Sequence, residues 1–255
     1  MENLTLEQKN YMNISRAKVL IVVPAYNEAG AIARTVKEIL FQSLNVQVCV
    51  VDDGSKDATA DQARAAKAMV LTLPFNLGIG GAVQTGFQFA AINNFDIVVQ
   101  VDGDGQHDAS YLPPLIQPLL DSQADMVIGS RFLTLDDGYR SSFWRRMGIR
   151  YFSRLIGLLT GAHVTDPTSG FRACNRKLIQ TFAEYYPQDF PEPEAIVVAR
   201  RMSAVVKEVP VRMRERSAGL SSIRRMKSFY YMIKVTCAIL LHMMRKQRKP
   251  QEYVH

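Results

Sequence analysis

Hydrophobic positions in the first half of the chain follow two alternating patterns. Residues 18–24 and 46–53 are almost continuous apolar runs, which are typical of parallel strands covered on both faces. Between them, apolar residues recur every three or four positions across residues 30–43, at Ile32, Val36, Ile39 and Leu40. This spacing predicts a helix with one buried face. The two patterns together predict strands and helices that alternate along the chain.

The same alternation continues to about residue 130. We expect strands at residues 18–24, 46–53, 69–74, 96–102 and 124–130, and helices at 30–43, 57–68, 80–92 and 111–120. Strand–helix repetition of this kind predicts an α/β fold with a doubly wound, Rossmann-like, mostly parallel sheet. Ligands of such sheets bind at the carboxyl ends of the strands.

The pattern changes after Arg131, where residues 141–161 form a basic amphipathic helix. On a helical plot its apolar arc holds Trp144, Met147, Tyr151, Phe152, Leu155, Leu158 and Leu159, and the opposite arc holds Arg146, Arg150, Ser153 and Arg154. Two interpretations remain open. The helix faces the core with a solvated polar side, or it lies on an anionic membrane surface.

A second helix of this type is expected near the C-terminus. The apolar residues 228–244 are flanked by basic clusters and are long enough to approach a bilayer's thickness. Lys234 and His242 interrupt the apolar stretch. We therefore expect an interfacial helix, or one that docks on a membrane partner, in preference to a transmembrane span.

Polar and charged residues gather where the predicted strands end. The segments are "PAYNE" at 24–28, "DDGS" at 52–55, "DGDGQH" at 102–107 and "GSR" at 129–131. Because the carboxyl ends of parallel strands meet at one edge of the sheet, these segments predict a ligand site there.

The pair Asp102 and Asp104 gives this site its most specific chemistry. Two carboxylates separated by one glycine repel each other unless a cation lies between them, and Gln106 can add a neutral oxygen. Oxygen ligands of this kind suit Mg²⁺, which commonly shares phosphate oxygens with a bound substrate. An EF-hand beginning at Asp102 is excluded because His107 and Pro113 occupy its glycine and glutamate positions. A zinc site at His107 lacks nearby histidine or cysteine.

Other loops narrow the class of ligand. Residues 76–86, "NLGIGGAVQTG", miss the third glycine of a dinucleotide fingerprint and follow the third strand instead of the first. No P-loop sequence occurs in the chain. Residues 166–176 bring small residues, a glycine and Arg172 to one loop, and residues 209–222 carry Arg212, Arg214 and Arg216. Arginine side chains suit diphosphates and lipid phosphates.

Composition adds limits on class and partner. The chain has 255 residues, of which 47% are hydrophobic, and a formal net charge of +7, which favours anionic partners. The basic residues interleave with large aliphatic ones on helices and match no nucleic-acid motif, so we expect no nucleic acid. Three scattered cysteines indicate reduced thiols in a cytoplasmic protein, and the N-terminal residues show no signal-peptide pattern.

These motifs together resemble the family 2 glycosyltransferases of GT-A fold, especially the dolichol- and polyprenyl-phosphate sugar synthases. The matching segments are "VVPAYNE", "VVDDGSKDAT", "NLGIGGAVQTG", "DGDGQHD", "GSRF", "DPTSGFRA" and "EVPVRMRERSAGLSS", in the family's order from about Lys18 to Ser222. One position departs from the family pattern. The closing loop often ends in lysine, where this chain has Ser222.

The resemblance implies a role for each matching residue. The nucleotide sugar would be held by Pro24, Ala25, Tyr26, Glu28, Val51, Asp53, Asp102, Gly103, Asp104 and Arg216. Mg²⁺ or Mn²⁺ would be held by Asp102, Asp104 and Gln106. The acceptor phosphate would be received by Arg131, Arg145 and Arg146, which makes Asp102, Asp104 and Arg131 the expected catalytic set.

The implied reaction moves a sugar, with inversion, from a nucleoside diphosphate sugar to polyprenyl phosphate for cell-surface glycan synthesis. A UDP-sugar is favoured, with a GDP-sugar as the alternative. A phosphate acceptor is already anionic and needs no base. The alternative acceptor is a sugar hydroxyl of a growing polysaccharide, which would need a base from Asp189, Glu192 or Glu194. A third hypothesis is a catalytically silent protein that tethers a membrane complex.

We expect three regions along the chain. Residues 1–17 form an N-terminal extension, 18–222 a GT-A catalytic domain, and 223–255 a basic amphipathic helix and tail. The protein is then cytoplasmic and peripheral on the cytoplasmic face of the membrane. A small membrane protein or a second copy of the chain is an expected partner.

Overall fold

The computed structural model describes residues 17–42, 44–133, 143–214 and 225–244, without the side chains of 143–145 and 225–231. Its first half alternates as the hydrophobic pattern predicts: β1 (Val19–Ala25), α2 (Ile32–Phe41), β2 (Val46–Asp52), α3 (Thr59–Ala65), β3 (Met69–Thr72), α4 (Gly78–Ile92), β4 (Ile97–Gln100), a 3₁₀ turn (Ala109–Tyr111), α5 (Leu112–Leu120) and β5 (Met126–Ser130). The second half contains α6 (Phe143–Thr160), β6 (Arg172–Asn175), α7 (Arg176–Glu184), α8 (Pro191–Arg201), β7 (Val206–Pro210) and α9 (Arg225–Met244).

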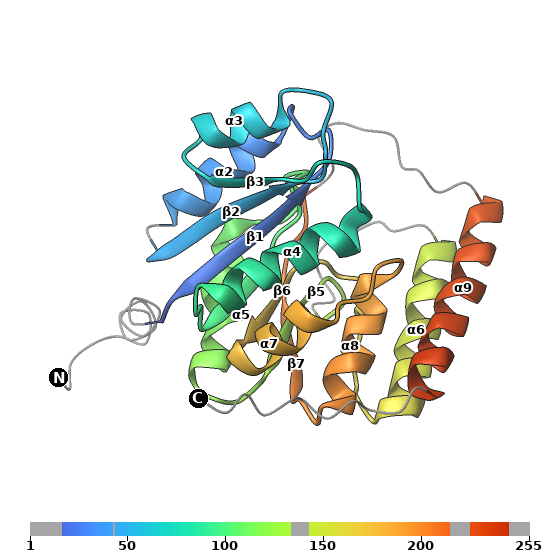
Figure 1. The fold of residues 1–255 in the computed structure, drawn as a ribbon. Coiled ribbons are helices and arrows are strands. Elements are labelled where there is room, and N and C mark those ends of the chain that lie inside the picture. The colour runs from blue at the N-terminus through green and yellow to red at the C-terminus, as the bar shows by residue number, and fades with distance from the viewer. Residues whose placement is uncertain (1–16, 43, 134–142, 215–224, 245–255) are drawn as a thin grey trace.

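The described strands form one seven-stranded sheet in the order β3-β2-β1-β4-β6-β5-β7 (Figure 1). β6 runs antiparallel to β4 and β5, and the other pairings are parallel. The chain moves outward from β1 to β2 and β3, then returns to place β4 on the other side of β1. A cleft at the carboxyl ends of such diverging strands is the usual ligand site of a doubly wound sheet.

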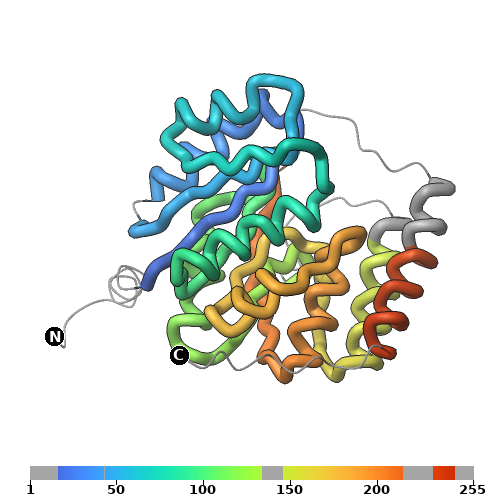
Figure 2. Tube along the Cα trace, in the orientation of Figure 1, coloured from blue at the N-terminus to red at the C-terminus, as the bar shows by residue number. Residues whose placement is uncertain are grey.

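Helices cover both faces of the sheet and create two hydrophobic layers. Leu20 and Val22 of β1 pack in the layer beneath α4, α6, α7, α8 and α9. Val19, Ile21 and Val23 pack in the opposite layer, beneath α2, α3 and α5. Successive side chains of a strand point to opposite faces, so β1 must be apolar throughout to serve both layers. Figure 2 shows the two halves of the chain, blue to green and yellow to red, as neighbouring parts of one body.

The sequence-based prediction was wrong for residues 166–176, which we expected to form one loop. Residues Arg172–Asn175 are instead strand β6, paired with both β4 and β5. Four residues with an arginine at one end give no strand periodicity, and only the sheet partners define the strand. α7 begins directly after β6, where the Asn175 side chain accepts a hydrogen bond from the Leu178 amide at 3.2 Å.

The amphipathic helix α6 is present, but its buried face differs from the predicted arc. Ile149, Phe152 and Ile156 are buried, whereas Leu158 is 85% exposed. Arg146, Arg150 and Arg154 are exposed, as expected. The buried face is centred on the residues that meet the core, and this centre cannot be read from the helical plot alone.

Helix α9 lies beside α6, as Figure 1 shows, and the Tyr151 and Thr236 hydroxyls are 3.0 Å apart. Val235 and Ile239 of α9 are fully buried in the same hydrophobic layer as Phe152 of α6. In the described part of the chain, no helix combines the length and apolar character needed to traverse a bilayer.

Candidate active site

A cleft of about 340 Å³ opens at the carboxyl ends of β1, β2 and β4. Eight of the residues expected to bind the nucleotide sugar line it: Pro24, Ala25, Tyr26, Glu28, Asp53, Asp102, Gly103 and Asp104. Its wall also includes Asn76, Gly78, Ile79, Ala82 and Glu192. The ends of three parallel strands and the beginning of α4 therefore contribute to a single site.

Asp53 joins β2 to the beginning of α4. Its buried carboxylate accepts hydrogen bonds from the backbone amides of Leu77 at 2.7 Å and Gly78 at 2.9 Å. These are amides that the first turn of a helix leaves without intrahelical partners, so an acidic side chain there is favourable. Asp53 thus fixes the 76–78 loop, which forms one wall of the cleft. The sequence pattern of residues 76–86 did not indicate this contact, which helps to hold Asn76 and Gly78 in the wall of the cleft.

The paired carboxylates follow β4 directly. Asp102 and Asp104 both line the cleft, and the Asp102 side chain is 39% exposed. Asp104 Oδ1 accepts the Gln106 backbone amide at 3.0 Å, which tightens the turn. The Gln106 side-chain amide nitrogen donates to the Arg214 carbonyl at 3.3 Å. The side-chain oxygen of Gln106 takes no part in this hydrogen bond.

The oxygen atoms of this site suit a hard divalent cation, but the protein supplies only part of the coordination shell. No group of three or more histidine, cysteine or acidic side chains able to hold a metal occurs among the described residues. Two carboxylates and an amide oxygen fill about half of an octahedral shell, and substrate phosphate and water commonly supply the remainder. Asp102 and Asp104 line the cleft and would hold the ion, whereas Gln106 is not among the residues that line it, and its role as a third ligand stays a prediction.

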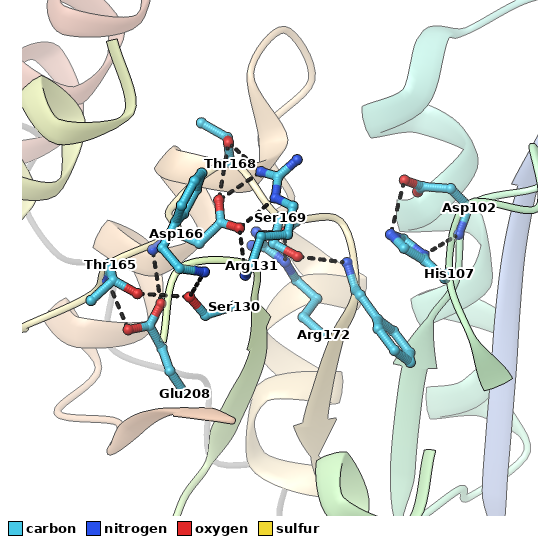
Figure 3. A network of polar contacts seen from close by, with 12 residues as sticks. Asp102, His107, Ser130, Arg131, Thr165, Asp166, Thr168, Ser169, Arg172 and Glu208 are labelled. Carbon is cyan, nitrogen blue, oxygen red and sulfur yellow. Dashed lines mark hydrogen bonds and ion pairs between the residues drawn. The ribbon is translucent and has the colours of Figure 1, made fainter. Parts of the chain in front are cut away.

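His107 lies in the 102–107 segment that was expected to contribute to a ligand site, although no specific role was predicted for it. It is buried and stacks on Phe171, with ring centroids 4.8 Å apart. Its Nδ1 accepts the Asp102 backbone amide at 3.0 Å, and its Nε2 lies 3.5 Å from Asp102 Oδ2 (Figure 3). Burial lowers the pKa of His107, although the nearby Asp102 and Asp104 charges act in the opposite direction. Because Nδ1 accepts a hydrogen bond, that nitrogen carries no proton, and the imidazole is neutral in this arrangement.

Arg131, at the end of β5, pairs with a buried carboxylate instead of lining the cleft. Its Nε and Nη2 donate to the two oxygens of Asp166 at 2.6 and 2.7 Å, and both side chains are almost fully buried (Figure 3). Such a bidentate pair fixes the guanidinium plane. A phosphate bound at Arg131 would have to share or replace the Asp166 contact.

Glu208 of β7 holds the same loop from the other side. Its two carboxylate oxygens accept the backbone amides of Thr165 and Asp166 at 2.7 and 2.8 Å. Burial raises the pKa of Glu208 despite these hydrogen bonds. Glu208 therefore orients the segment that carries the partner of Arg131.

Arg172 connects this loop to α8. It is fully buried, and its guanidinium donates to the carbonyls of Ser169 and Glu192, the latter at 2.9 Å. This bond holds the first turn of α8 beside the cleft. The structure thus uses Arg172 to hold the backbone around the site.

The three candidate bases differ in position. Glu192 lines the cleft with Asp102 and Asp104, and burial raises its pKa while the Arg172 charge acts in the opposite direction. Glu194 is buried in α8, and Asp189 is exposed; neither lines this cleft. Glu192 is therefore the one of the three that lines the cleft with the paired carboxylates.

Other predicted site residues lie away from the cleft or outside the described part of the chain. Val51 is fully buried in the core. Arg146 is exposed on α6. Arg216, Ser222 and the side chain of Arg145 lie outside the described residues.

Arg214 connects the cleft loop to α2. Its side chain pairs with Glu38 at 2.6 Å and Asp108 at 3.3 Å, and its backbone amide donates to the Gln106 carbonyl at 2.9 Å. Bonding to Glu38 and the Asp108 charge raise the pKa of Arg214 despite partial desolvation. The sequence identified Arg214 only as one of several loop arginines.

Comparison with known proteins assigns the family. Residues 20–182 match the model for "Glycosyl transferase family 2". The chain is 31% identical to an undecaprenyl-phosphate mannosyltransferase of Micrococcus luteus, over 81% of this chain and 87% of that protein. It is 28% identical to a UDP-N-acetylglucosamine–dolichyl-phosphate N-acetylglucosaminyltransferase of Methanococcus voltae, over 76% and 84% of the two chains.

Solved structures agree on the fold. Glucosyl-3-phosphoglycerate synthase of Mycobacterium tuberculosis, in complex with Mn²⁺, uridine diphosphate and phosphoglyceric acid, superposes with a TM-score of 0.72 at 20% identity, covering 98% of this chain and 86% of that one. The doubly wound α/β architecture expected from the sequence is therefore confirmed as the GT-A fold. The ordered motifs, the matched residues and the fold lead to the same conclusion: the chain belongs to glycosyl transferase family 2.

Proposed function

We propose that this glycosyltransferase moves a sugar from a nucleoside diphosphate sugar to polyprenyl phosphate. The observation that carries the proposal is the cleft in which six other expected donor-binding residues meet the Asp102 and Asp104 carboxylates. Relatives named for undecaprenyl and dolichyl phosphate support the acceptor class. The catalytic domain spans residues 18–222 in this proposal, with 1–17 and 223–255 as flanking regions.

The donor diphosphate would share its metal with Asp102, Asp104 and Gln106. Mg²⁺ or Mn²⁺ would stabilise the negative charge that develops on the departing nucleoside diphosphate. The Mn²⁺ and uridine diphosphate bound in the Mycobacterium tuberculosis structure support a UDP-sugar, and a GDP-sugar is the alternative donor. Pro24, Tyr26, Glu28 and Asp53 would surround the nucleotide, with Arg216 closing over the diphosphate.

The transfer needs no protein base when the acceptor is a phosphate monoester. Its oxygen is already anionic near neutral pH, so it attacks the anomeric carbon from the side opposite the diphosphate. The new bond joins that carbon to the lipid phosphate oxygen. The bond to the diphosphate oxygen breaks with its electron pair, and the anomeric centre inverts.

The lipid acceptor would reach the site along α6 and α9. Exposed apolar side chains occur on both helices, at Met147, Leu158, Ile233, Leu240, Leu241 and Met244. Arg146, Arg150 and Arg154 are exposed on α6. Apolar and basic side chains on neighbouring helices suit the surface of an anionic membrane.

This arrangement supports a peripheral enzyme on the cytoplasmic face. A small membrane protein or a second copy of the chain remains a proposed partner. We propose that Arg145 and Arg146 contact the acceptor phosphate, and that Arg131 does so where it can share its Asp166 contact.

Glu192 favours a second candidate, transfer to a sugar hydroxyl. Glu192 lines the same cleft as the paired carboxylates and has a raised pKa, as a general base near neutral pH requires. In the leading proposal the same side chain binds a hydroxyl of the donor sugar.

A transfer assay separates the two candidates. Purified protein is incubated with Mn²⁺ or Mg²⁺, radiolabelled UDP- or GDP-sugars and two acceptors, vesicles that contain undecaprenyl phosphate and a water-soluble oligosaccharide. We expect the label in the organic phase, and none with undecaprenol, which lacks the phosphate, or with an Asp102→Asn variant. Label found only in a water-soluble oligosaccharide would support the second candidate, and no transfer from any common donor would overturn both.

A further inference from the structure

One hydrogen bond and one close approach connect His107 to Asp102, the first to its backbone and the second to its side chain. The Asp102 backbone amide donates to His107 Nδ1 at 3.0 Å. A nitrogen that accepts this bond carries no proton, so the neutral imidazole carries its proton on Nε2. That Nε2 lies 3.5 Å from Asp102 Oδ2. The fold therefore fixes the tautomer that presents an N–H group to the carboxylate.

The Nε2 atom has no hydrogen-bond partner among the described residues. The His107 side chain is 1% exposed, so water does not compensate for this. A buried donor without a partner costs free energy. Such a group is retained where a neighbouring acceptor can approach it, and the nearby acceptor here is Asp102 Oδ2.

The loop before β6 restricts both side chains. A Cβ atom added to Gly170 would lie 2.8 Å from Asp102 Oδ1 and 3.0 Å from Oδ2. The carboxylate therefore occupies space that only glycine leaves open at that position. The next residue, Phe171, stacks on the His107 ring with an interplanar angle of 14°. Asp102 is thus placed between the Gly170 backbone and the His107 edge.

The other side of the His107 segment is also held. His107 pairs with Met213 in an isolated antiparallel bridge, and the neighbouring Arg214 amide donates to the Gln106 carbonyl at 2.9 Å. The imidazole is therefore a rigid support, because the stack and the two backbone contacts limit its movement.

We propose that His107 is a positioning residue for the metal site, whose Nε2–H group holds Oδ2 of Asp102 so that Oδ1 is presented to the cation. The inference rests on the proposed function, in which Asp102 binds a metal shared with the donor diphosphate. Groups that orient a metal ligand in this way typically change metal affinity by about 10- to 100-fold when removed. His107 itself contacts neither metal nor substrate.

Three substitutions distinguish this role from simple packing. His107→Phe keeps an aromatic ring for the stack but removes both nitrogens. His107→Gln places an amide donor near the position of Nε2, and His107→Asn places an amide oxygen near the position of Nδ1. A purely structural role predicts that the Asn variant is the better replacement, because it can still accept the Asp102 amide.

The measurement is Mn²⁺ affinity in the presence of saturating uridine diphosphate, from the electron paramagnetic resonance signal of free Mn²⁺. We expect affinity to fall about 10- to 100-fold in the Phe and Asn variants and to be largely restored in the Gln variant. His163→Phe, at an exposed histidine, is the matched control and is expected to bind as the wild type does. A Phe variant within twofold of the wild type, or an Asn variant better than Gln, would overturn the inference.

A second readout uses the unmodified protein and does not depend on variants that fold. Nitrogen-15 correlation spectra of the histidine rings report which nitrogen carries the proton. We expect His107 to be protonated at Nε2, with a change in its Nε2–H resonance when Mg²⁺ and uridine diphosphate are added together. A proton on Nδ1 would overturn the inference. Failure of the wild-type protein to bind metal with uridine diphosphate would instead overturn the proposed function, and the inference with it.

Discussion

The three acidic residues after β4 have different surroundings. Asp102 and Asp104 line the cleft. The Asp108 carboxylate accepts the Ser110 amide at 2.9 Å and pairs with Arg214 at 3.3 Å. Burial alone would raise the pKa of Asp108, but the Ser110 hydrogen bonds and the Arg214 charge lower it below its ordinary value. Proximity in sequence therefore does not imply a shared function.

This difference predicts unequal effects of the same substitution. We expect Asp102→Asn or Asp104→Asn to lower the transfer rate at least about 100-fold, because removing one preorganised stabilising group at a reacting centre typically has an effect of that size. Asp108→Asn keeps a capping side chain and loses mainly a partly exposed ion pair, so the free energy of unfolding should fall by less than about 1 kcal/mol. Transfer rates, Mn²⁺ binding and urea unfolding measure these effects. Equal activity losses at all three positions would contradict the assignment.

Glu192 gives a prediction about pH. Its pKa is raised by burial, and the Asp102 charge adds to the effect, so the side chain gains its proton at a higher pH than an ordinary glutamate. A base at this position would make the rate fall as pH decreases through that raised pKa. With a phosphate acceptor, we expect Glu192→Gln to lower the rate less than about 10-fold and to leave the acid limb of the pH–rate profile unchanged.

Wild type and Glu192→Gln would be compared from pH 5 to 8 at saturating donor. A loss of 100-fold or more, together with disappearance of the acid limb, would favour a hydroxyl acceptor. The conservative Glu192→Asp variant keeps the carboxylate charge on a shorter side chain. It therefore tests whether the charge alone is sufficient or whether the length of the glutamate side chain is also required.

At the scale of elements, the Arg131–Asp166 pair joins the end of β5 to the loop before β6. Removing one partner from a buried ion pair leaves an uncompensated charge, which typically costs about 3–5 kcal/mol. We therefore expect Arg131→Met to lower the free energy of unfolding by about that amount, as measured by denaturant titration. Arg146→Met removes an exposed arginine and should change it by less than about 0.5 kcal/mol.

This prediction also separates two roles of Arg131. A variant with wild-type stability but weakened use of polyprenyl phosphate would identify Arg131 as a phosphate ligand. A destabilised variant that still uses the lipid acceptor at low temperature would identify a structural role.

The sequence predicted the elements whose pattern is long and local. β1 and β2 are continuous apolar runs, and their ends differ from the predicted ones by a single residue. β6, α7 and α8 were not foreseen. β6 has four residues whose conformation is set by β4 and β5, and α8 begins with "PEPE", which shows no apolar periodicity. Pairing and packing across the sheet define β6 and α8, and neither is visible in a local pattern.

Site residues, like the elements, could be predicted where a local pattern indicates them and not where contacts between distant segments define them. Residues at strand ends, such as Tyr26, Asp53 and Asp102, were found because the sheet places strand ends together. The hydrogen bond from Arg214 to Glu38 joins residues 176 positions apart in the sequence, so no local spacing predicts it. His107 is adjacent to the motif, yet its role depends on which ring nitrogen faces the Asp102 amide. That information exists only in the folded chain.

At the scale of the whole molecule, the exposed side chains of the proposed membrane surface on α6 and α9 can be compared with those of the helical layer on the other face of the sheet. Leu158 on α6 and Leu241 on α9 are 85% and 63% exposed, and three exposed arginines lie along α6. Phe41 on α2 is 84% exposed but belongs to the layer on the other side of the sheet. An exposed apolar side chain by itself has little meaning, so the combination of apolar and basic residues on one face is the relevant feature.

We expect the protein to co-sediment with vesicles rich in phosphatidylglycerol, and less so as salt rises from 0.1 to 0.5 M because screening weakens the basic contribution. Burial of a leucine side chain stabilises by about 1.5–3 kcal/mol, so Leu158→Glu or Leu241→Glu should lower vesicle affinity at least about tenfold. Phe41→Glu makes a comparable change on the other layer and should leave vesicle affinity unaltered. Equal losses in all three variants would indicate non-specific adsorption. Unchanged binding of uridine diphosphate and Mn²⁺ in the leucine variants would show that a loss of vesicle binding arises at the membrane surface and not at the cleft.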